Sequence, residues 1–208
     1  GSRHLQEFSL LEWDLKNSDY EQLMQDCEQL FVHLRPAGQL RWQGTEIDLT
    51  RPWRRMTVRE AFAQHASCSA DQAIENNRFE EVLTAEVEPA LGPSPVFLTE
   101  YPAPLAALAR TKKTDPSVAE RCELYIGGME LANGFSELND PVEQRNRFEQ
   151  DELQRRDAGK PPCPLPAAFL AELGNLPEAA GIALGIDRLV MLLTDAPAID
   201  DVVAFLPD

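Results

Sequence analysis

The chain has 208 residues, of which 43% are hydrophobic and 26% charged, a balance that predicts one soluble globular domain with a sizeable core. Its 19 basic and 35 acidic side chains give a net charge of −16, so it lacks the basic surface of a general nucleic-acid or anionic-membrane binder. There is no signal-peptide pattern and no apolar run long enough to cross a bilayer, and the four cysteines are far apart. We therefore expect a cytoplasmic protein with free thiols.

The first predicted element is a strand between residues 7 and 16, where apolar and polar residues alternate. Successive side chains of a strand point to opposite faces, so Phe8, Leu10, Glu12 and Asp14 should share one face. Phe8 and Glu12 can therefore face the same cleft.

A capping box, Ser18 followed by Glu21, predicts that a helix begins after the first strand and runs to about Leu34. Residues 40–49 read as a hairpin that turns near Gly44. The elements predicted beyond it are a helix capped by Thr57 (58–65), a strand (96–100), a charged helix that begins at Pro141 (141–157) and a short helix (167–173).

Residues 120–138 predict two strands that join or bulge at Gly127-Gly128. In the second strand Asn133, Phe135 and Glu137 alternate, so they should share a face. That face offers an amide, an aromatic wall and a carboxylate, which together suit a cationic amino-acid side chain. The alternative is that these acids are ordinary charges of an edge strand.

Glu123 and Glu130 are carboxylates in an otherwise apolar neighbourhood, where burial is costly unless a positive group compensates it. Strict alternation places Glu130 on the face opposite to Glu137. It joins the same site only if a bulge near Gly134 shifts the register.

Residues 180–193 predict a buried strand that passes directly into a helix, with Gly185 at the junction and Asp187-Arg188 in the first helical turn. Glycine lets another group approach the backbone, and Asp187 is favourable at the positive end of a helix. Arginine is suited to binding phosphates and to stacking on flat rings. The alternatives are a chance match to a short glycine-rich pattern, or a structural ion pair at Arg188.

This stretch resembles motif 3 of the class II aminoacyl-tRNA synthetases, in which small residues alternate up to Gly-x-Asp/Glu-Arg before a helix. The resemblance implies that Gly185 lines an ATP site and that Arg188 lies over the adenine and reaches the terminal phosphates. Residues 3–8 and 11–13 are similar to the second half of motif 2. Motif 1 and the first half of motif 2 are absent, so residues 1–208 are expected to be the C-terminal portion of a class II synthetase-like catalytic domain.

The strand pattern and the resemblance together predict an α+β fold with a class II aminoacyl-tRNA synthetase-like sheet flanked by helices. The sheet should be mostly antiparallel, with the helices packed on one side. Its predicted strands lie within residues 7–16, 96–100, 120–138 and 180–186.

Residues 123–140, ELYIGGMELANGFSELND, resemble the matching segment of lysyl-tRNA synthetases. They resemble even more closely that of a paralogous family, the elongation factor P–(R)-β-lysine ligases. This second resemblance covers nearly the whole chain and is weak only in residues 36–95. Ala183 stands where lysyl-tRNA synthetases usually carry glycine and the ligases alanine, and the stretch from Pro161 to Leu173 is also similar to the ligases.

The ligase resemblance implies a role for each matching residue. Glu123 and Glu130 would hold Mg²⁺ on the phosphates of ATP, and Glu130-Leu131 would also lie near the nucleotide. Phe8 would stack beneath the adenine, and His4 would approach the γ-phosphate. The residues implied to hold the substrate amino acid are Glu12, Asp14, Asn133, Phe135, Glu137 and Ala183.

Two departures from the family pattern are present: Leu5-Gln6 replaces Asn-Pro, and Asp14 replaces a tyrosine that helps to hold the substrate. The second leaves the exact amino acid open. The implied reaction is ATP-dependent formation of an acyl-adenylate, with Arg188 as a catalytic residue, followed by transfer to a lysine of elongation factor P. The resemblance implies ATP and Mg²⁺ as cofactors, a small-molecule amino acid and elongation factor P as partners, and a homodimer for the full-length protein.

Two alternatives stay open. The chain could be a catalytic fragment of a lysyl-tRNA synthetase, or a non-catalytic synthetase-like module that only binds or dimerises. The arginine that clamps the α-phosphate in these families belongs to the absent half of motif 2, so the activity of this chain alone is a separate question.

Overall fold

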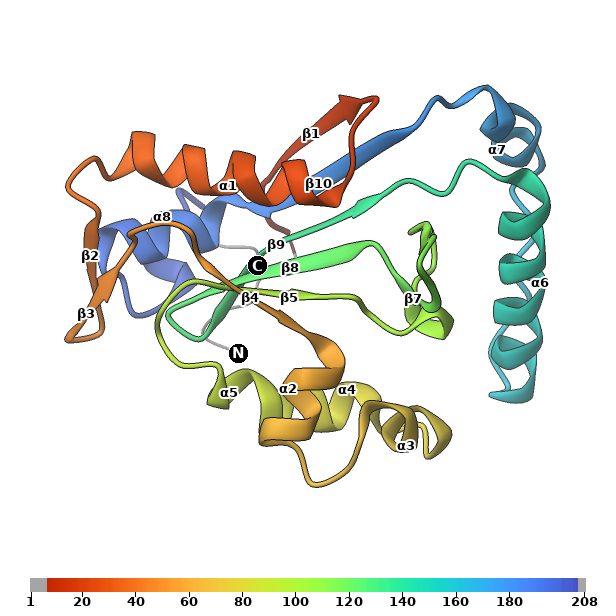
Figure 1. Cartoon of the computed structure of the whole chain (residues 1–208), viewed down its shortest axis with the longest axis horizontal. Helices are drawn as coiled ribbons and strands as arrows, with labels where there is room; N and C mark the ends of the chain where they lie inside the picture. The colour runs from red at the N-terminus through yellow and green to blue at the C-terminus, as the bar shows by residue number, and fades with distance from the viewer. Residues whose placement is uncertain (1–6, 206–208) are drawn as a thin grey trace.

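A six-stranded sheet forms the centre of the computed structural model, which describes residues 7–205 (Figure 1). All neighbouring strands run antiparallel except β4 and β5, which are parallel. The predicted α+β fold with a mostly antiparallel sheet is therefore confirmed, although β4 was not anticipated. From one edge to the other the strands are β1 (Leu10–Lys16), β10 (Ala179–Gly185), β9 (Met129–Ser136), β8 (Arg121–Ile126), β5 (Val96–Thr99) and β4 (Arg54–Thr57).

The β8–β9 hairpin turns at Gly127 and Gly128, as predicted. Their φ angles are +64° and +67°, in the left-handed region that two-residue hairpin turns require and that glycine adopts without strain. Gly127 also allows a close approach, since a Cβ there would lie 2.6 Å from Cδ1 of Trp42. Trp42 ends the first strand of a second hairpin, β2 (Gln39–Trp42) and β3 (Thr45–Asp48), whose predicted turn near Gly44 is also confirmed.

Helix α1 (Tyr20–Leu34) covers one face of the sheet through a buried stripe that includes Leu23, Cys27 and Phe31. The prediction that Ser18 caps this helix is wrong. The cap is Asp19, whose carboxylate accepts hydrogen bonds from the first-turn amides of Glu21 and Gln22, and aspartate is as effective a cap as serine. The amide of Tyr20 donates to Oγ of the buried Ser136, which fixes the start of the helix on β9.

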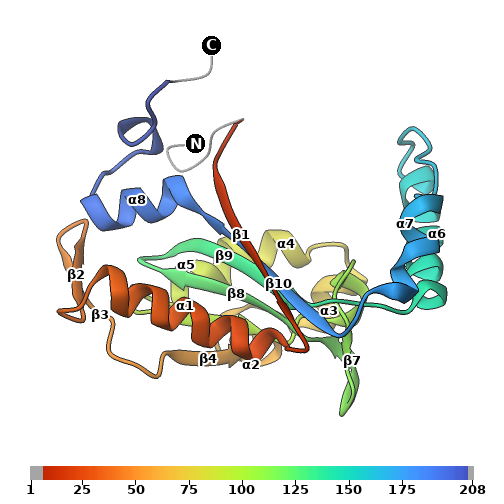
Figure 2. The same ribbon diagram turned by 90° about the horizontal axis from the view of Figure 1, so that it is seen from above.

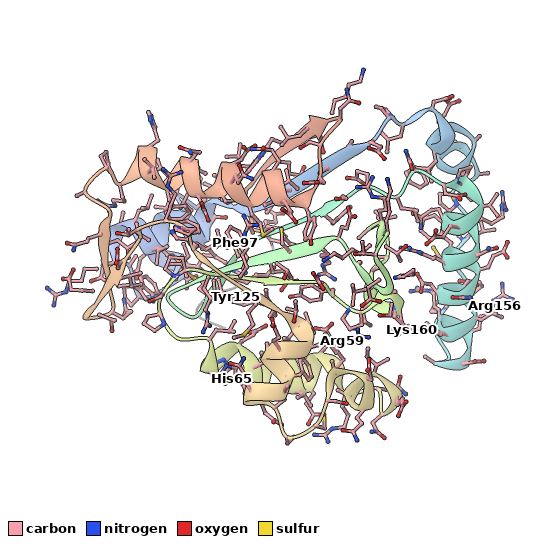
Figure 3. The ribbon with its side chains drawn as sticks, in the orientation of Figure 1. Arg59, His65, Phe97, Tyr125, Arg156 and Lys160 are labelled. Atoms are coloured by element: carbon pink, nitrogen blue, oxygen red, sulfur yellow. The ribbon has the colours of Figure 1, made fainter. Side chains whose placement is uncertain are left out.

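The expectation that the helices pack on one side is wrong, because a second group covers the opposite face of β4, β5 and β8. All four residues of β5 are buried, so both of its faces must be covered. Figure 3 shows Phe97 on the side of α1 and Tyr125 on the side of the second group. That group consists of α2 (Val58–His65, with the predicted Thr57 cap), α3 (Ala70–Glu75), α4 (Phe79–Val82), a π-helical turn (Leu83–Val87) and α5 (Glu88–Ala90).

The remaining elements lie around this core. Helices α6 (Pro141–Asp157) and α7 (Ala167–Glu172) pack side by side beyond one end of the sheet (Figure 2), and α6 begins at Pro141 as predicted. Helix α8 (Ile186–Thr194) continues from β10, and β6 (Thr111–Lys112) and β7 (Asp115–Ala119) form a small hairpin. Three short 3₁₀ turns span Ala103–Leu105, Leu173–Asn175 and Ile199–Asp201. In the described part of the chain, none of the helices has the length and apolarity that a membrane span requires.

Candidate functional site

The sheet brings most of the predicted site residues together on the face turned away from α1. Residues that pair directly across neighbouring strands point to the same face, so the strand register defines rows of side chains. The first row contains Glu12, Ala183, Asn133 and Glu123. The second contains Asp14, Gly181, Phe135 and Arg121.

Glu130 reaches this face because β9 contains a bulge, but the bulge is not near Gly134 as predicted. Leu124 pairs with Ala132 while Tyr125 pairs with Glu130, so Leu131 is the extra residue. Leu131 and Ala132 are both buried in the α1-side core. Two adjacent apolar residues that face the same core break the alternation, and this places Glu130 on the face of Tyr125 and Glu123.

A cavity of about 300 Å³ lies where β1, β9 and β10 meet the start of α8. Its wall combines an exposed aromatic ring, Phe8, with a guanidinium group, Arg188, and bare backbone at Gly185. Ring and guanidinium are surfaces on which a flat heterocycle can stack. The other predicted site residues that line this cavity are Glu130, Leu131, Asn133 and Ala183.

Local contacts hold this end of the site in place. Ser9 donates its amide to Oδ2 of Asp187 at 2.8 Å and accepts a hydrogen bond from the amide of Ile186 at 2.9 Å. The start of β1 is thereby tied to the start of α8, which keeps Phe8 beside the cavity. Nη1 of Arg188 donates to the carbonyl oxygen of Glu130 at 2.8 Å and lies 3.5 Å from its Oε2.

Three carboxylates, those of Glu88, Glu123 and Glu130, lie near one another at this end of the site, and Arg188 acts on the first and the last of them. Burial and the neighbouring Glu123 raise the pKa of Glu130, while Arg188 acts in the opposite direction. Burial likewise raises the pKa of Glu88, a residue of α5 that sequence reasoning missed. Glu88 Oε1 lies 3.2 Å from the hydroxyl of Tyr125, and that hydroxyl lies 2.7 Å from Oε2 of Glu123. This end of the site therefore carries an excess of partly buried negative charge.

Such a group could share a divalent cation with a phosphate ligand. Within residues 7–205, no three His, Cys, Asp or Glu side chains are arranged to hold a metal ion by themselves. Mg²⁺ commonly takes only one or two protein carboxylates and completes its shell with phosphate and water. Glu130 fits that role. The oxygens of Glu123 already accept three hydrogen bonds, from Arg121, Tyr101 and Tyr125, so one of the roughly four lone-pair sites of that carboxylate is left for a metal ion.

At the other end of the face, Asp14 and Glu137 converge above Gly181. A Cβ on Gly181 would lie 2.4 Å from Oδ1 of Asp14 and 3.1 Å from Oε1 of Glu137. Within residues 7–205, neither carboxylate has a hydrogen bond or an ion pair. Burial and then the charge of Asp14 raise the pKa of Glu137 to about 7. Two unpaired carboxylates around a bare backbone position form a place for a cationic group.

The structure thus places the predicted residues at two ends of one face, and their roles stay predictions. Phe135 and the exposed Glu12 also lie on this face, where Phe135 pairs with Gly181 and Glu12 pairs with Ala183. His4 lies outside the described residues. Sequence reasoning missed Glu88, Arg121, Tyr101 and Tyr125. The alternation of Arg121, Glu123 and Tyr125 along β8 could have revealed two of them.

The antiparallel sheet, with a strand running through Gly185 into the helix that carries Arg188, defines a class II synthetase-like domain. Residues 1–207 match the family of class II tRNA synthetases (D, K and N), and the chain belongs to that family. It is similar to curated lysine–tRNA ligases from several bacteria. The ligase of Moorella thermoacetica is 35% identical over 230 residues, which cover 98% of this chain and 47% of the relative.

Other relatives show the same pattern of coverage. The lysine–tRNA ligase of Fervidobacterium nodosum is 38% identical over 227 residues, covering 98% of this chain and 44% of the relative. That of a Psychrobacter species is 36% identical over 232 residues, covering 98% and 45%. The chain spans about half the length of the curated relatives that it matches.

Proposed function

We propose that the chain binds ATP and a lysine-type amino acid and forms the acyl-adenylate. The observation that carries this proposal is that one face of the sheet has two distinct ends. Phe8 and Arg188 line the cavity at one end, and the carboxylates of Asp14 and Glu137 lie at the other. A ring and an arginine suit adenine and phosphate, while two carboxylates suit an ammonium group. The lysine–tRNA ligases among the relatives support the same class of amino acid.

In the proposed reaction, a carboxylate oxygen of the amino acid attacks the α-phosphorus of ATP. The bond between the α- and β-phosphates breaks, and pyrophosphate leaves. The residues of this chain bind and orient the reactants: Arg188 holds the phosphates, while Asp14 and Glu137 fix the ammonium group and so direct the carboxylate. Mg²⁺, when bound at Glu130 and Glu123, would neutralise part of the phosphate charge.

We further propose (R)-β-lysine as the amino acid and a lysine amine of elongation factor P as the acceptor. Attack of that amine on the acyl-adenylate forms an amide bond and releases AMP. Ala183 lines the cavity, and its methyl group occupies space that a glycine would leave open. The net charge of −16 favours a protein acceptor over a nucleic acid, since tRNA binding normally requires a basic surface.

The second candidate is activation of α-lysine for transfer to tRNA, which the names of the relatives favour. The third, a module that binds or dimerises without catalysis, rests on the Asp14 and Leu5-Gln6 departures from the family pattern. The test is ATP–pyrophosphate exchange by the protein as its gene encodes it, with (R)-β-lysine, α-lysine and no amino acid. Labelled amino acid is then offered to elongation factor P and to tRNA.

Exchange that depends on β-lysine, with label on elongation factor P, supports the proposal. Preference for α-lysine with label on tRNA selects the second candidate. Absence of amino-acid-dependent exchange selects the third.

Affinity for the cationic amino acid should rise with pH between 6 and 8. The pKa of Glu137 lies near 7 in the free protein, and a bound ammonium favours its ionised form. The ionised fraction of such a group grows about tenfold over this range, and the side-chain ammonium of lysine stays charged. Calorimetric titration should show this rise for the wild type and for a Glu46→Gln control. Glu137→Gln should bind weakly with a flat pH profile, and an unchanged slope in that variant would refute the assignment.

The same pKa predicts the pH dependence of stability in the absence of ligand. A carboxyl group whose pKa is raised on folding binds more protons in the folded state between its unfolded and folded pKa values. The contribution of Glu137 to the free energy of unfolding should therefore fall from about pH 4.5 to about pH 7. Glu137→Gln should reduce that decline in urea titrations.

A further inference from the structure

Arg121, the first residue of β8, lies on the site face between the two ends. It pairs with Phe135 in the strand register, and its side chain is 22% exposed. Its guanidinium contacts one residue predicted to bind the metal, Glu123, and one predicted to bind the amino acid, Asn133. Nη2 donates to Oε1 of Glu123 at 2.8 Å, and Nε donates to Oδ1 of Asn133 at 3.2 Å.

Two further contacts fix the plane of this guanidinium. Its central carbon lies 4.4 Å from the centre of the Tyr101 ring, and Nη1 donates to the carbonyl oxygen of Leu105 at 3.3 Å. A planar fork with several donors holds partners at set angles, which a lysine ammonium cannot do. The Tyr101 ring and the Leu105 carbonyl therefore fix the guanidinium of Arg121. The same guanidinium donates hydrogen bonds to Glu123 and Asn133.

The two partners depend on Arg121 to different degrees. Glu123 also accepts hydrogen bonds from the hydroxyl groups of Tyr101 and Tyr125, so it keeps two donors without the arginine. For the Asn133 side chain, Arg121 is the sole hydrogen-bond partner among residues 7–205. Loss of the arginine should therefore release Asn133 first and leave Glu123 in place.

We propose that Arg121 is a positioning residue for amino-acid activation that acts mainly through Asn133. It orients the amide of Asn133 toward the bound amino acid and leaves its NH₂ group free to donate to the substrate. This inference rests on the proposed function, because it concerns the amino acid that the same site binds.

The test compares Arg121→Lys with a matched control, Arg110→Lys. Arg110 is also partly buried and ion-paired, to Glu120 at 2.7 Å and to Glu178 at 3.5 Å. Among residues 7–205, its side chain has no hydrogen bond or ion pair with a predicted site residue. In the protein as its gene encodes it, Arg121→Lys should raise the KM for the amino acid about tenfold. That factor matches the loss of one hydrogen bond to a polar group. The KM for ATP should change less than twofold, and Arg110→Lys should leave both constants unchanged.

A double-mutant cycle identifies the residue through which Arg121 acts. If Arg121 works through Asn133, Arg121→Lys should add less than twofold to the amino-acid KM in an Asn133→Ala background. The proposal would be overturned if the rise in amino-acid KM in the double variant equalled the product of the rises in the two single variants. So would a lowered Tm in Arg121→Lys with an unchanged KM, since that describes a purely structural arginine.

A readout without catalysis separates this inference from the proposed function. The side-chain NH₂ signals of Asn133, assigned by their absence in Asn133→Ala, should shift in Arg121→Lys and not in Arg110→Lys. Unshifted signals would overturn the positioning role whatever the activity. Absence of amino-acid-dependent exchange in the wild type would instead refute the proposed function. If Arg121→Lys does not fold, Arg121→Gln is measured in the same way and judged by the same outcomes.

Discussion

Replacement of Arg188 by alanine should slow amino-acid-dependent ATP–pyrophosphate exchange about 100-fold or more and lower the Tm only slightly. The guanidinium lines the same cavity as the exposed ring of Phe8, and its charge lowers the pKa of Glu130 and of Glu88 against the effect of their burial. A charge-assisted contact to developing phosphate charge contributes on the order of a few kcal/mol to the barrier, and each 1.4 kcal/mol or so is tenfold in rate.

The matched control for this variant is Arg54→Ala. Arg54 also donates to a backbone carbonyl, that of Leu91 at 3.1 Å, but it belongs to β4, away from the cavity. The Arg54→Ala variant should have a lower Tm than the wild type and keep its ATP–pyrophosphate exchange activity. The contrary account treats Arg188 as a structural partner of Glu130. In that case Arg188→Ala would melt at a clearly lower temperature, while its folded fraction kept full activity.

Gly181→Ala should raise the KM for the amino acid about 30-fold and leave the KM for ATP nearly unchanged. The added methyl would lie 2.4 Å from Oδ1 of Asp14, which must move, and 3.1 Å from Oε1 of Glu137. Both atoms are the ends of side chains, so the fold should tolerate the change. The cation site would be displaced, and loss of a charge-assisted contact of about 2 kcal/mol corresponds to the expected factor.

Gly134→Ala provides the control for this variant, because Gly134 belongs to the same sheet but faces the core. Its added methyl would lie 2.8 Å from Cβ of Ile182 and 3.1 Å from the carbonyl oxygen of Gly181. Overpacking of this kind costs about 1–3 kcal/mol of stability. Thermal melts and kinetics on both variants should therefore show opposite patterns. A stable Gly181→Ala with unchanged amino-acid KM would remove the cation site from the account.

Periodicity predicted much of the site, because alternation is a property of neighbouring residues. It placed Asn133, Phe135 and Glu137 on one face. The register of β9 and β10 agrees for Asn133 and Phe135, and the carboxylate of Glu137 lies beside Gly181, the partner of Phe135. Periodicity could not place Glu130, because a bulge depends on which residues the core accepts. The adjacent pair Leu131-Ala132, both buried, was the local sign of that bulge.

Features made by distant segments were not predictable in the same way. Glu88 reaches Tyr125 from a short helix within residues 36–95, the stretch in which the family resemblance is weak. The second group of helices, which covers the opposite face of β5, was not predicted. The apolar run of β5 indicates that both faces of the strand are buried, but it does not reveal which segments cover them. At the start of α1, Ser18 and Asp19 were both suitable caps, and local propensity does not choose between adjacent good caps.

The central claim is that one face of the sheet binds ATP near Phe8 and Arg188 and a cationic amino acid near Asp14 and Glu137. The most direct measurement is a crystal structure with a lysyl-adenylate analogue in which a sulfamoyl group replaces the phosphate. The account predicts the adenine between Phe8 and Arg188, with the terminal ammonium within about 3 Å of a carboxylate oxygen of Asp14 or Glu137. An analogue bound away from this face, or with its ammonium remote from both carboxylates, would contradict the account.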